Sequence, residues 1–374
     1  MNATPRPAKP QIIRMYIASL AGGGSERVCV ELCNGFVSRG VKVELLLVNA
    51  FGPYLDQLDQ RVRLVDFKAS RGLKALLPVS RLLRSAPRIP VLVFGFNLGF
   101  SILLARSMGW HHAPVIYREG SAPKCYLKQP KKFAYSWTIR QADKVIAQST
   151  TAREELVGFG MRRESIQIIP NPQRRPGLPV GKHQRLPNAA PLVLAVGRLA
   201  PEKGFDRLIR GFQRLHAAIP GARLAILGEG LQRARLEQLT KELDLKECVS
   251  LPGFMTNIDS WYQRASLFVL SSHHEGQPNV LIEAILGECP VVCAAGQGGT
   301  VELMRDVGLA DCIVADARFE QLFSEQARRV LDLDTTRWQS AREKLAALTD
   351  SETVVQQYLN VCEVAAGQPD PAGY

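Results

Sequence analysis

Short apolar runs alternate with amphipathic segments along most of the chain, and turns rich in glycine or proline separate them. The first apolar run, Gln11–Ser19, precedes a glycine-rich turn, an amphipathic segment at Val28–Arg39 and a second apolar run at Val41–Val48. Such runs predict buried strands, and apolar residues at helical spacing predict the helices between them. Because alternating strands and helices build parallel sheets, the pattern predicts an α/β fold.

The same alternation resumes after a segment without periodicity. Residues 173–191 are rich in Pro, Gly, Arg and Lys, which is typical of a linker, and the apolar run Leu192–Val196 follows them. A length of 374 residues accommodates two domains. We therefore expect a first domain over 1–172, a linker over 173–191, a second domain over 192–350, and a final helix with a tail over 351–374.

The composition is that of a globular chain, with 46% apolar residues and a mean hydropathy of −0.04. The longest uncharged apolar stretch, Ile89–Ala105, is interrupted by proline and glycine, which predicts a strand, a turn and a helix rather than a membrane span. Met1–Pro10 has no apolar core, so we expect no secretory signal. The eight cysteines form no Cys-x-x-Cys or Cys/His array, which predicts a reducing, cytoplasmic setting without structural zinc.

Charge is distributed unevenly along the chain. The net charge is +12, but residues 1–185 hold 29 Lys and Arg against 11 Asp and Glu, whereas residues 186–374 hold 18 against 24. A basic half suits nucleic acid, an anionic membrane or a phosphorylated substrate. Because no nucleic-acid-binding motif is present, we expect one or both of the other two partners and no nucleic acid.

Two basic segments of the first half are amphipathic or aromatic. Arg71–Arg84 mixes cations with leucines, and Lys124–Trp137 mixes lysines with aromatic residues; both suit a lipid headgroup interface. The alternatives are a helix that flanks the sheet and a solvated loop. For the first segment we expect membrane contact before Pro78 and packing on the sheet after it. In the alternative of a helix that flanks the sheet, Leu76, Leu77, Leu82 and Leu83 would face the core.

The densest group of chemically suggestive residues lies at Ser271–Ala284, between the apolar runs Ala265–Leu270 and Pro290–Cys293. The order predicts strand, loop, helix and strand, with Glu275 in the loop and Glu283 in the helix. An ordinary strand–helix–strand unit with solvated glutamates is the alternative.

The helix in this stretch is expected to begin at Pro278-Asn279. The amides of Asn279, Val280 and Leu281 would then point out of the helix N-terminus, where an anion is stabilised. The sequence thus predicts an anion site flanked by two carboxylates.

The spacing Glu275-Gly276-x-Pro278, then seven residues between Glu275 and Glu283, then Gly287-x-x-Pro290-Val291-Val292, resembles the signature of family 4 retaining glycosyltransferases of the GT-B fold. The resemblance implies two Rossmann-like parallel-sheet domains that face a central crevice. It also implies that the first domain binds the acceptor, that the second binds a nucleotide-sugar, and that the last helix crosses back to the first domain.

Other turns resemble the same family. The string Gly-Gly-Gly-x-Glu-Arg at 22–27 resembles its first loop, beside the donor diphosphate and the acceptor, and Gly197-Arg198 with Lys203-Gly204 resembles its phosphate-contacting pattern. The turn around Gly253 corresponds to the nucleobase side, where Ile258 is the expected lining residue. The donor-binding residues that the resemblance implies are Gly23, Gly24, Arg198, Lys203, Gly253, Ile258, Glu275, Gly276, Gln277, Pro278, Asn279, Val280, Leu281 and Glu283.

The loop after Val115-Ile116-Tyr117 departs from the family pattern. Many members have a His near here, close to the transferred sugar, whereas this chain has Arg118-Glu119 and resembles a subset with that pair. We expect both residues on the acceptor side. Whether they replace the family His is left open.

The resemblance implies a division of chemical roles. Arg198 and Lys203 would neutralise the diphosphate, Glu283 would accept hydrogen bonds from the ribose diol, and Glu275 would contact the sugar, so that no metal or other cofactor is needed. The expected catalytic residues are Glu275, Arg198 and Lys203. The one Asp-x-Asp, at 332–334, is interpreted as a surface turn.

The sequence therefore predicts a retaining glycosyltransferase that moves a hexose or N-acetylhexosamine from a UDP-sugar or other nucleotide-sugar. The expected acceptor is a lipid-linked oligosaccharide or a lipopolysaccharide or exopolysaccharide precursor, at the inner face of the cytoplasmic membrane. A sugar-nucleotide epimerase of the same fold and a noncatalytic nucleotide-sugar-binding protein are the alternatives. A Rossmann dehydrogenase is disfavoured because the first turn lacks the full glycine fingerprint.

Overall fold

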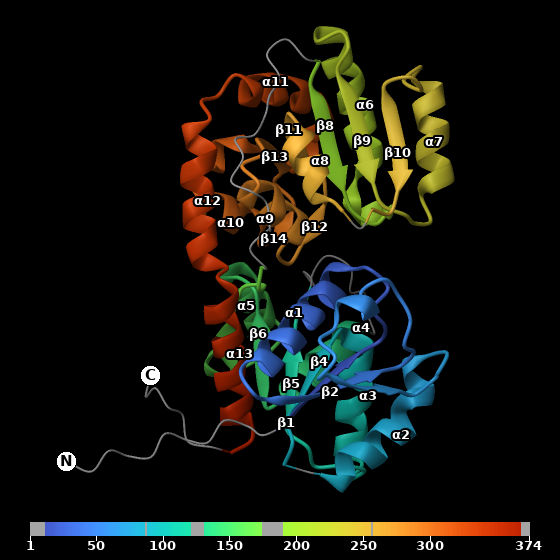
Figure 1. Cartoon of the computed structure of the whole chain (residues 1–374), viewed down its shortest axis with the longest axis vertical. Helices are drawn as coiled ribbons and strands as arrows, with labels where there is room; N and C mark the ends of the chain where they lie inside the picture. Colours follow the sequence, from blue (N-terminus) through green and yellow to red (C-terminus); the bar gives the residue numbers. More distant parts are fainter. Residues whose placement is uncertain (1–11, 87, 121–130, 174–189, 256, 368–374) are drawn as a thin grey trace, which may run out of the picture. The chain divides into compact units, whose positions relative to one another are not determined.

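The computed structural model describes residues 12–86, 88–120, 131–173, 190–255 and 257–367 (Figure 1). They form two units, each built on its own parallel sheet. The first unit contains the described residues up to 173 together with residues 349–367, and the second contains residues 190–348. Most of the predicted linker, residues 174–189, lies outside the described residues.

The first unit has a seven-stranded sheet with the order β3-β2-β1-β4-β5-β6-β7, and all of its pairings are parallel. Its strands are β1 (Ile12–Ile17), β2 (Lys42–Leu47), β3 (Arg63–Asp66), β4 (Val91–Phe94), β5 (Val115–Arg118), β6 (Lys144–Ala147) and β7 (Ile166–Ile168). Its helices are α1 (Gly24–Ser38), α2 (Gly72–Ser85), α3 (Phe96–Ser107), α4 (Lys131–Gln141), α5 (Thr150–Gly158) and α13 (Ser351–Ala365). Short 3-10 helices lie at Leu55–Gln57 and Arg163–Ser165.

Helices cover both faces of this sheet. Buried residues of α1 and α13 share one apolar cluster with β1 and β2, and those of α2, α3, α4 and α5 share another with the opposite strand faces. The helices α1 and α13 approach closely at Gly35, where a Cβ would lie 2.5 Å from a methyl group of Val355. The C-terminal helix is therefore an integral part of the first unit.

The second unit has a six-stranded parallel sheet with the order β10-β9-β8-β11-β13-β15 and a separate two-stranded ladder, β12-β14. Its strands are β8 (Leu192–Val196), β9 (Arg223–Leu227), β10 (Val249–Gly253), β11 (Leu267–Leu270), β12 (His274–Glu275), β13 (Val291–Ala294), β14 (Gln297–Gly298) and β15 (Ile313–Val314). Its α-helices are α6 (Phe205–Ala218), α7 (Arg233–Glu242), α8 (Asp259–Arg264), α9 (Asn279–Leu286), α10 (Thr300–Asp306), α11 (Phe319–Leu331) and α12 (Thr336–Leu348). Its 3-10 helices are Pro201–Lys203, Ala310–Cys312 and Asp316–Arg318.

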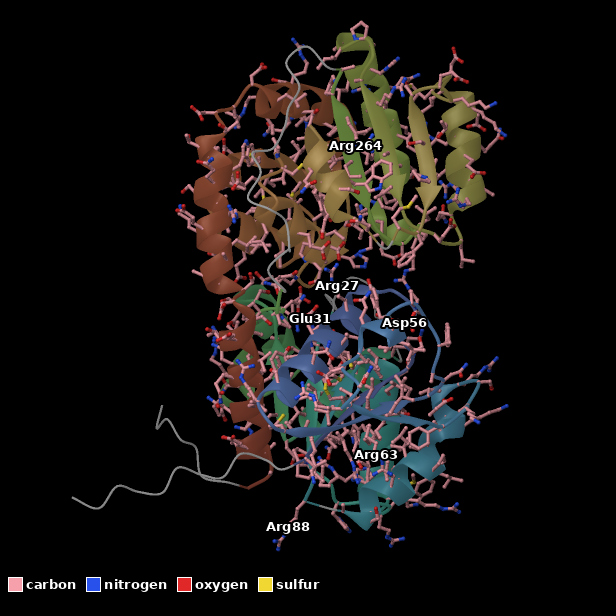
Figure 2. All side chains as sticks on the ribbon, viewed as in Figure 1. Arg27, Glu31, Asp56, Arg63, Arg88 and Arg264 are labelled. Atoms are coloured by element: carbon pink, nitrogen blue, oxygen red, sulfur yellow. The ribbon has the colours of Figure 1, made fainter. Side chains whose placement is uncertain are left out.

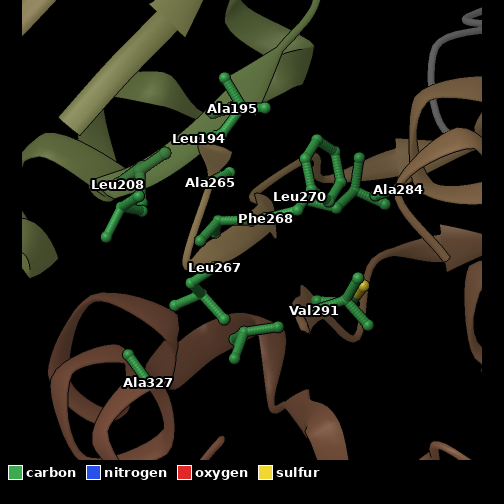
Figure 3. Close-up of a cluster of buried hydrophobic side chains, with 14 of the residues drawn as sticks. Leu194, Ala195, Leu208, Ala265, Leu267, Phe268, Leu270, Ala284, Val291 and Ala327 are labelled. Atoms are coloured by element: carbon green, nitrogen blue, oxygen red, sulfur yellow. The ribbon is translucent and has the colours of Figure 1, made fainter. Parts of the chain in front are cut away.

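The core of the second unit is built from fully apolar strands. Figure 3 shows side chains of β8 and β11, among them Leu194 and Phe268, packed with Leu208 of α6, Ala284 of α9 and Ala327 of α11. Near-continuous apolar strands are expected where helices cover a parallel sheet on both faces. Both sheets are parallel, so the predicted fold class is confirmed.

The apolar stretch at Ile89–Ala105 is a strand and a helix, as predicted, with Gly95 between β4 and α3. Within the part of the chain that the structure describes, no helix is both long and apolar enough to cross a membrane. Cys29 and Cys33, and likewise Cys289 and Cys293, are four residues apart in sequence, and all four are buried core residues.

The first basic segment is a single helix, α2, that continues through Pro78, so the expected division at Pro78 between membrane contact and packing on the sheet is wrong. Leu76 and Leu83 are buried and Leu82 is partly buried, as in the flanking-helix alternative, whereas Leu77 is 54% exposed. At about 100° per residue, Leu76 lies about 20° around the helix from the fully buried Leu83, whereas Leu77 lies about 120° from it and so falls outside the buried face. In the second basic segment, residues 124–130 lie outside the described residues, and the remainder begins α4.

The strand orders fix where a ligand would bind in each unit. Both sheets reverse their winding direction at a switch point, which lies between β1 and β4 in the first unit and between β8 and β11 in the second. Ligands of doubly wound sheets bind beyond the carboxyl ends of the strands at such points. In the second unit, the loops there begin at Gly197 and Ser271.

Candidate functional site

The loops that follow β8 and β11 are joined by hydrogen bonds. Ser271 donates from Oγ to the carbonyl of Lys203 at 2.8 Å, and the amide of His273 donates to the carbonyl of Glu202 at 2.9 Å. The amide of Gln297 in turn donates to the carbonyl of His273 at 2.8 Å, which adds β14 to the assembly. These bonds fix the backbone from which the predicted donor-binding side chains project.

Lys203 and Glu275 form the centre of this site. The ammonium Nζ of Lys203 donates to Oε1 of Glu275 at 2.6 Å, and Oγ of Ser272 donates to the same oxygen at 2.7 Å. The two charged side chains are only 21% and 14% exposed. A partly buried pair is less screened by solvent than a surface pair, so the cation and the carboxylate hold each other in place.

A glycine permits the close approach of the two loops. Gly204 has a left-handed backbone, with φ +60°, and a Cβ there would lie 2.4 Å from the carbonyl oxygen of Ser271. A side chain at this position would push the loops apart and would move Lys203 with them.

Arg207, in the first turn of α6, is a site residue that sequence reasoning missed. Its Nε donates to the carbonyl of Ser271 at 2.9 Å, its Nη1 lies 2.7 Å from Oδ1 of Asp316, and its guanidinium stacks over the ring of Phe319. A cation in the first turn of a helix interacts unfavourably with the helix dipole. An arginine at this position could therefore have been recognised in the sequence as a residue with a specific role. Arg207 holds the loop that carries Glu275.

Arg198 has a different environment from Lys203. Its side chain is 73% exposed and its Nη2 lies 3.1 Å from Oε1 of Glu202. An exposed pair of this kind contributes about 1 kcal/mol or less, so the guanidinium can exchange Glu202 for an anionic ligand at little cost. Beside these loops is an open hollow of about 470 Å³. It is lined by Pro201, Glu202, Asp206, Gln232, Arg235, His273 and His274.

The helix α9 begins at Asn279 with Pro278 as its N-cap. The amide of Leu281 donates to the carbonyl of Pro278 at 3.1 Å, so it does not point out of the helix as the sequence suggested. The predicted anion-binding end therefore does not include the amide of Leu281. Gly276 is also tied into the loop, because its carbonyl accepts from the amide of Gly299 at 3.1 Å.

Glu283 lies further along α9 and is 7% exposed. The hydroxyl of Tyr262, in α8, lies 3.2 Å from its Oε2 and 3.0 Å from the carbonyl of Val280. Tyr262 thereby orients the carboxylate at the same end of the helix. Sequence reasoning did not identify Tyr262, because it is 21 residues from Glu283 and sits among core residues.

The predicted nucleobase side lies at the end of β10. Gly253 has a φ of +95°, and its Cβ would lie 3.0 Å from Oε1 of Glu229, which is paired with Arg233. Ile258 caps α8 and packs partly against the core. Both positions belong to the second unit, as do Arg198, Lys203, Glu275 and Glu283.

Gly23 and Gly24 lie in the first unit, at the start of α1 after β1. Gly23 is the N-cap of the helix, and its carbonyl accepts the amide of Arg27 at 3.1 Å. A Cβ at Gly23 would collide with the Glu26 carboxylate at 2.3 Å. The glycine turn thus follows the switch-point strand of its own sheet.

Arg118 and Glu119 end β5 in the first unit and are each 2% exposed. Arg118 donates from Nε to the hydroxyl of Tyr358 in α13 at 3.0 Å, donates from Nη2 to Asn171, and lies over the ring of Phe94. Glu119 accepts from the Tyr117 hydroxyl at 3.2 Å and from that of Tyr135. Because both side chains are buried, their part in acceptor binding stays a prediction.

Two family models match the chain. One matches most of the first unit, and the other matches most of the second unit. Residues 23–172 match the model described as "Glycosyl transferase 4-like domain", and residues 182–345 match "Glycosyl transferases group 1". A Campylobacter jejuni protein, N-acetylgalactosamine-N,N'-diacetylbacillosaminyl-diphospho-undecaprenol 4-alpha-N-acetylgalactosaminyltransferase, is 30% identical over 79% of this chain and 84% of its own length. The chain belongs to the family 4 glycosyltransferases. It is therefore an enzyme that transfers a sugar.

Further similarities agree with this family. The lipopolysaccharide core biosynthesis glycosyltransferase LpsE of Rhizobium meliloti is 26% identical over 91% of this glycosyltransferase and 95% of its own length. The crystal structure of Anabaena Alr3699/HepE in complex with UDP-glucose superposes with a TM-score of 0.80 at 19% identity, and the match covers 95% of this chain and 99% of the other. The likeness to that structure shows the GT-B fold.

A conservative change at Glu283 tests its place in this glycosyltransferase. Glu283→Gln should raise the Kd of UDP about tenfold, because an amide accepts fewer hydrogen bonds from a diol than a carboxylate does. Tyr262→Phe should give a smaller rise, since the carboxylate remains but is less well oriented. Isothermal titration calorimetry measures both. Equal affinities for the wild type and Glu283→Gln would remove Glu283 from the nucleotide site.

Proposed function

We propose that this glycosyltransferase is a retaining enzyme that moves a hexose or N-acetylhexosamine from a UDP-sugar to a lipid-linked or lipopolysaccharide-type acceptor. The observation that carries the proposal is the Lys203–Glu275 pair, held at 2.6 Å at the switch point of the second unit. A fixed cation at that edge suits a diphosphate, and a fixed carboxylate beside it suits the hydroxyls of a sugar.

The donor diphosphate would be held by two cations of different mobility. Lys203 is fixed by Glu275, whereas Arg198 is exposed and can close over a bound anion. When the sugar leaves, negative charge grows on the nucleotide diphosphate. Preorganised cations and the amide end of α9 stabilise that charge. We therefore propose that the reaction needs no metal ion, because the two cations would neutralise the diphosphate as a divalent ion would.

The sugar and the ribose would be held by two carboxylates. Glu275 and the loop to Pro278 would contact the sugar, and Glu283 would accept hydrogen bonds from the ribose hydroxyls. We propose that the acceptor oxygen attacks from the face that the diphosphate leaves and that a phosphate oxygen takes its proton. The bond from the anomeric carbon to phosphate oxygen breaks as the new glycosidic bond forms on the same face.

The acceptor proposal rests on charge and on relatives. The name of the Campylobacter jejuni relative includes a diphospho-undecaprenol acceptor, and that of LpsE refers to the lipopolysaccharide core. The first 185 residues of this chain carry 29 Lys and Arg against 11 Asp and Glu. A basic surface suits an anionic bilayer, so we place the reaction at the inner face of the cytoplasmic membrane.

The alternatives differ in what they do to the donor. A sugar-nucleotide epimerase would convert one UDP-sugar into another without releasing UDP, and a noncatalytic protein would bind the donor unchanged. Two assays separate these outcomes: UDP and GDP release from a panel of sugar nucleotides, and chromatography of the recovered donor. Both are run with and without a bacterial membrane-lipid extract.

Release of UDP from one donor that increases with the extract is the expected result. A second UDP-sugar in the recovered donor would favour the epimerase. Binding without turnover, with every donor and extract, would favour the noncatalytic protein. Absence of any nucleotide binding would contradict the whole proposal.

A further inference from the structure

We propose that the outer face of α2, formed by Leu73, Lys74, Leu77, Pro78, Arg81 and Arg84, is the surface through which the enzyme inserts into an anionic bilayer. The inference rests on the proposed acceptor and membrane location, and it names the residues that make the contact. All six side chains are exposed. At about 100° per residue they fall within an arc of about 140° of the helix.

The opposite face of α2 is fixed to the first unit. Ala75, Val79 and Leu83 are buried in the apolar cluster shared with α3, and Leu76 is also buried. At the start of the helix, a Cβ on Gly72 would lie 2.7 Å from Leu98 of α3. The outer face is therefore presented by a packed helix and does not need to fold on contact with lipid.

Two leucines on this face are exposed. Leu73 is 76% exposed and Leu77 is 54% exposed, and they lie one helical turn apart. Single exposed leucines are common on soluble proteins, but adjacent ones on an otherwise cationic helix are the pattern of helices that lie in a membrane interface. Such side chains reach the boundary between headgroups and acyl chains.

The charged residues around Leu73 and Leu77 are cationic. Residues 67–118 hold eight Lys and Arg and no Asp or Glu. On and beside α2 the exposed cations are Lys68, Arg71, Lys74, Arg81, Arg84 and Arg88. Figure 2 shows Arg88, just beyond the end of the helix, extending away from the ribbon. A partner protein would need an acidic surface with an apolar centre; an anionic bilayer offers both without a specific shape.

The experiment is co-sedimentation of the full chain with vesicles of phosphatidylcholine that contain about one-third phosphatidylglycerol. The wild type should bind, and binding should fall as salt rises. Leu73→Glu with Leu77→Glu should weaken binding at least about tenfold, since burial of each leucine is lost and two anions are added. Removing the charges of Lys74, Arg81 and Arg84 with glutamine should weaken it about fivefold per cation.

Matched controls lie in the second unit. Leu231→Glu changes a fully exposed leucine, and a triple glutamine variant of Arg210, Lys241 and Lys246 removes three exposed cations. Both controls should bind vesicles like the wild type. If the leucine variant misfolds, Leu73→Ser with Leu77→Ser replaces it and should still weaken binding.

Two results would overturn the inference. One is wild-type protein that stays in the supernatant at low salt. The other is α2 variants that bind as well as the wild type does; if they also shift the elution volume of the lipid-free protein, α2 joins two copies of this chain instead. UDP release from the panel of donors with the membrane-lipid extract is measured in parallel. Absence of UDP release from every donor, with intact vesicle binding, would contradict the transferase proposal and leave the membrane surface standing.

Discussion

Replacing Lys203 with alanine should lower kcat/KM for the sugar donor by about 10²–10³-fold, the cost of removing one preorganised donor from a developing anion. The change removes the cation that would face the diphosphate. It also removes the cation from Glu275, whose side chain is 14% exposed, and leaves that carboxylate hydrogen-bonded to the Ser272 hydroxyl. Steady-state UDP release over a range of donor concentrations measures the effect.

Whether kcat or KM changes distinguishes a role of Lys203 in the transition state from a role in binding the donor. A lower kcat at similar KM indicates that Lys203 acts on charge formed in the transition state, and a higher KM alone indicates ground-state binding of the diphosphate. Lys203→Arg keeps the charge but changes the geometry, so it should recover part of the rate. Lys241→Ala, at the exposed end of α7, is the control and should leave the kinetics unchanged. A kcat/KM within about threefold of the wild type for Lys203→Ala would remove this residue from catalysis.

Replacing Arg118 with alanine should destabilise the first unit by about 3–4 kcal/mol. The loss combines a cavity where the buried guanidinium lay with the stranded hydroxyl of Tyr358, and a buried polar group without its partner costs about 1–3 kcal/mol. For a unit of this size, the corresponding fall in Tm is about 6–16 °C. Differential scanning calorimetry measures it, and the transition of the second unit should not move.

Two further variants test how much of the stability loss comes from the Arg118–Tyr358 pair. Tyr358→Phe removes only the hydroxyl from the pair and should cost about 1–3 kcal/mol. Arg88→Ala changes an exposed arginine of the same unit and should stay within about 0.5 kcal/mol. If Arg118→Ala keeps the wild-type Tm while UDP release onto a lipid acceptor falls, Arg118 serves the acceptor, as the sequence suggested, and not the attachment of α13.

The stability argument bears on the position of the C-terminal helix. Residues 349–367 return to the first unit after the whole second unit, and α13 is held there by packing at Gly35 and by the bond from Arg118 to Tyr358. Loosening that attachment would free the end of the chain. Limited proteolysis of Arg118→Ala should therefore cleave within α13 sooner than it does in the wild type.

The sequence by itself determined the fold class, the order of strands and helices, and the glycine turns that follow the central strands. These features are local, because periodic apolar residues and turn residues act within a few positions of one another. The motif around Glu275 and Glu283 also lies within one strand–helix unit, so its spacing alone indicated the family.

The tertiary structure decided which side chains meet. Arg118 binds Tyr358 across 240 residues, Arg207 reaches Ser271 across 64, and no local pattern encodes either pairing. Leu76 and Leu77 are neighbouring residues of the same type, and only the orientation of α2 on the first unit buries one and exposes the other. Burial and pairing depend on elements distant along the chain, because hydrophobic packing and charge respond to distance in space and not to distance in sequence.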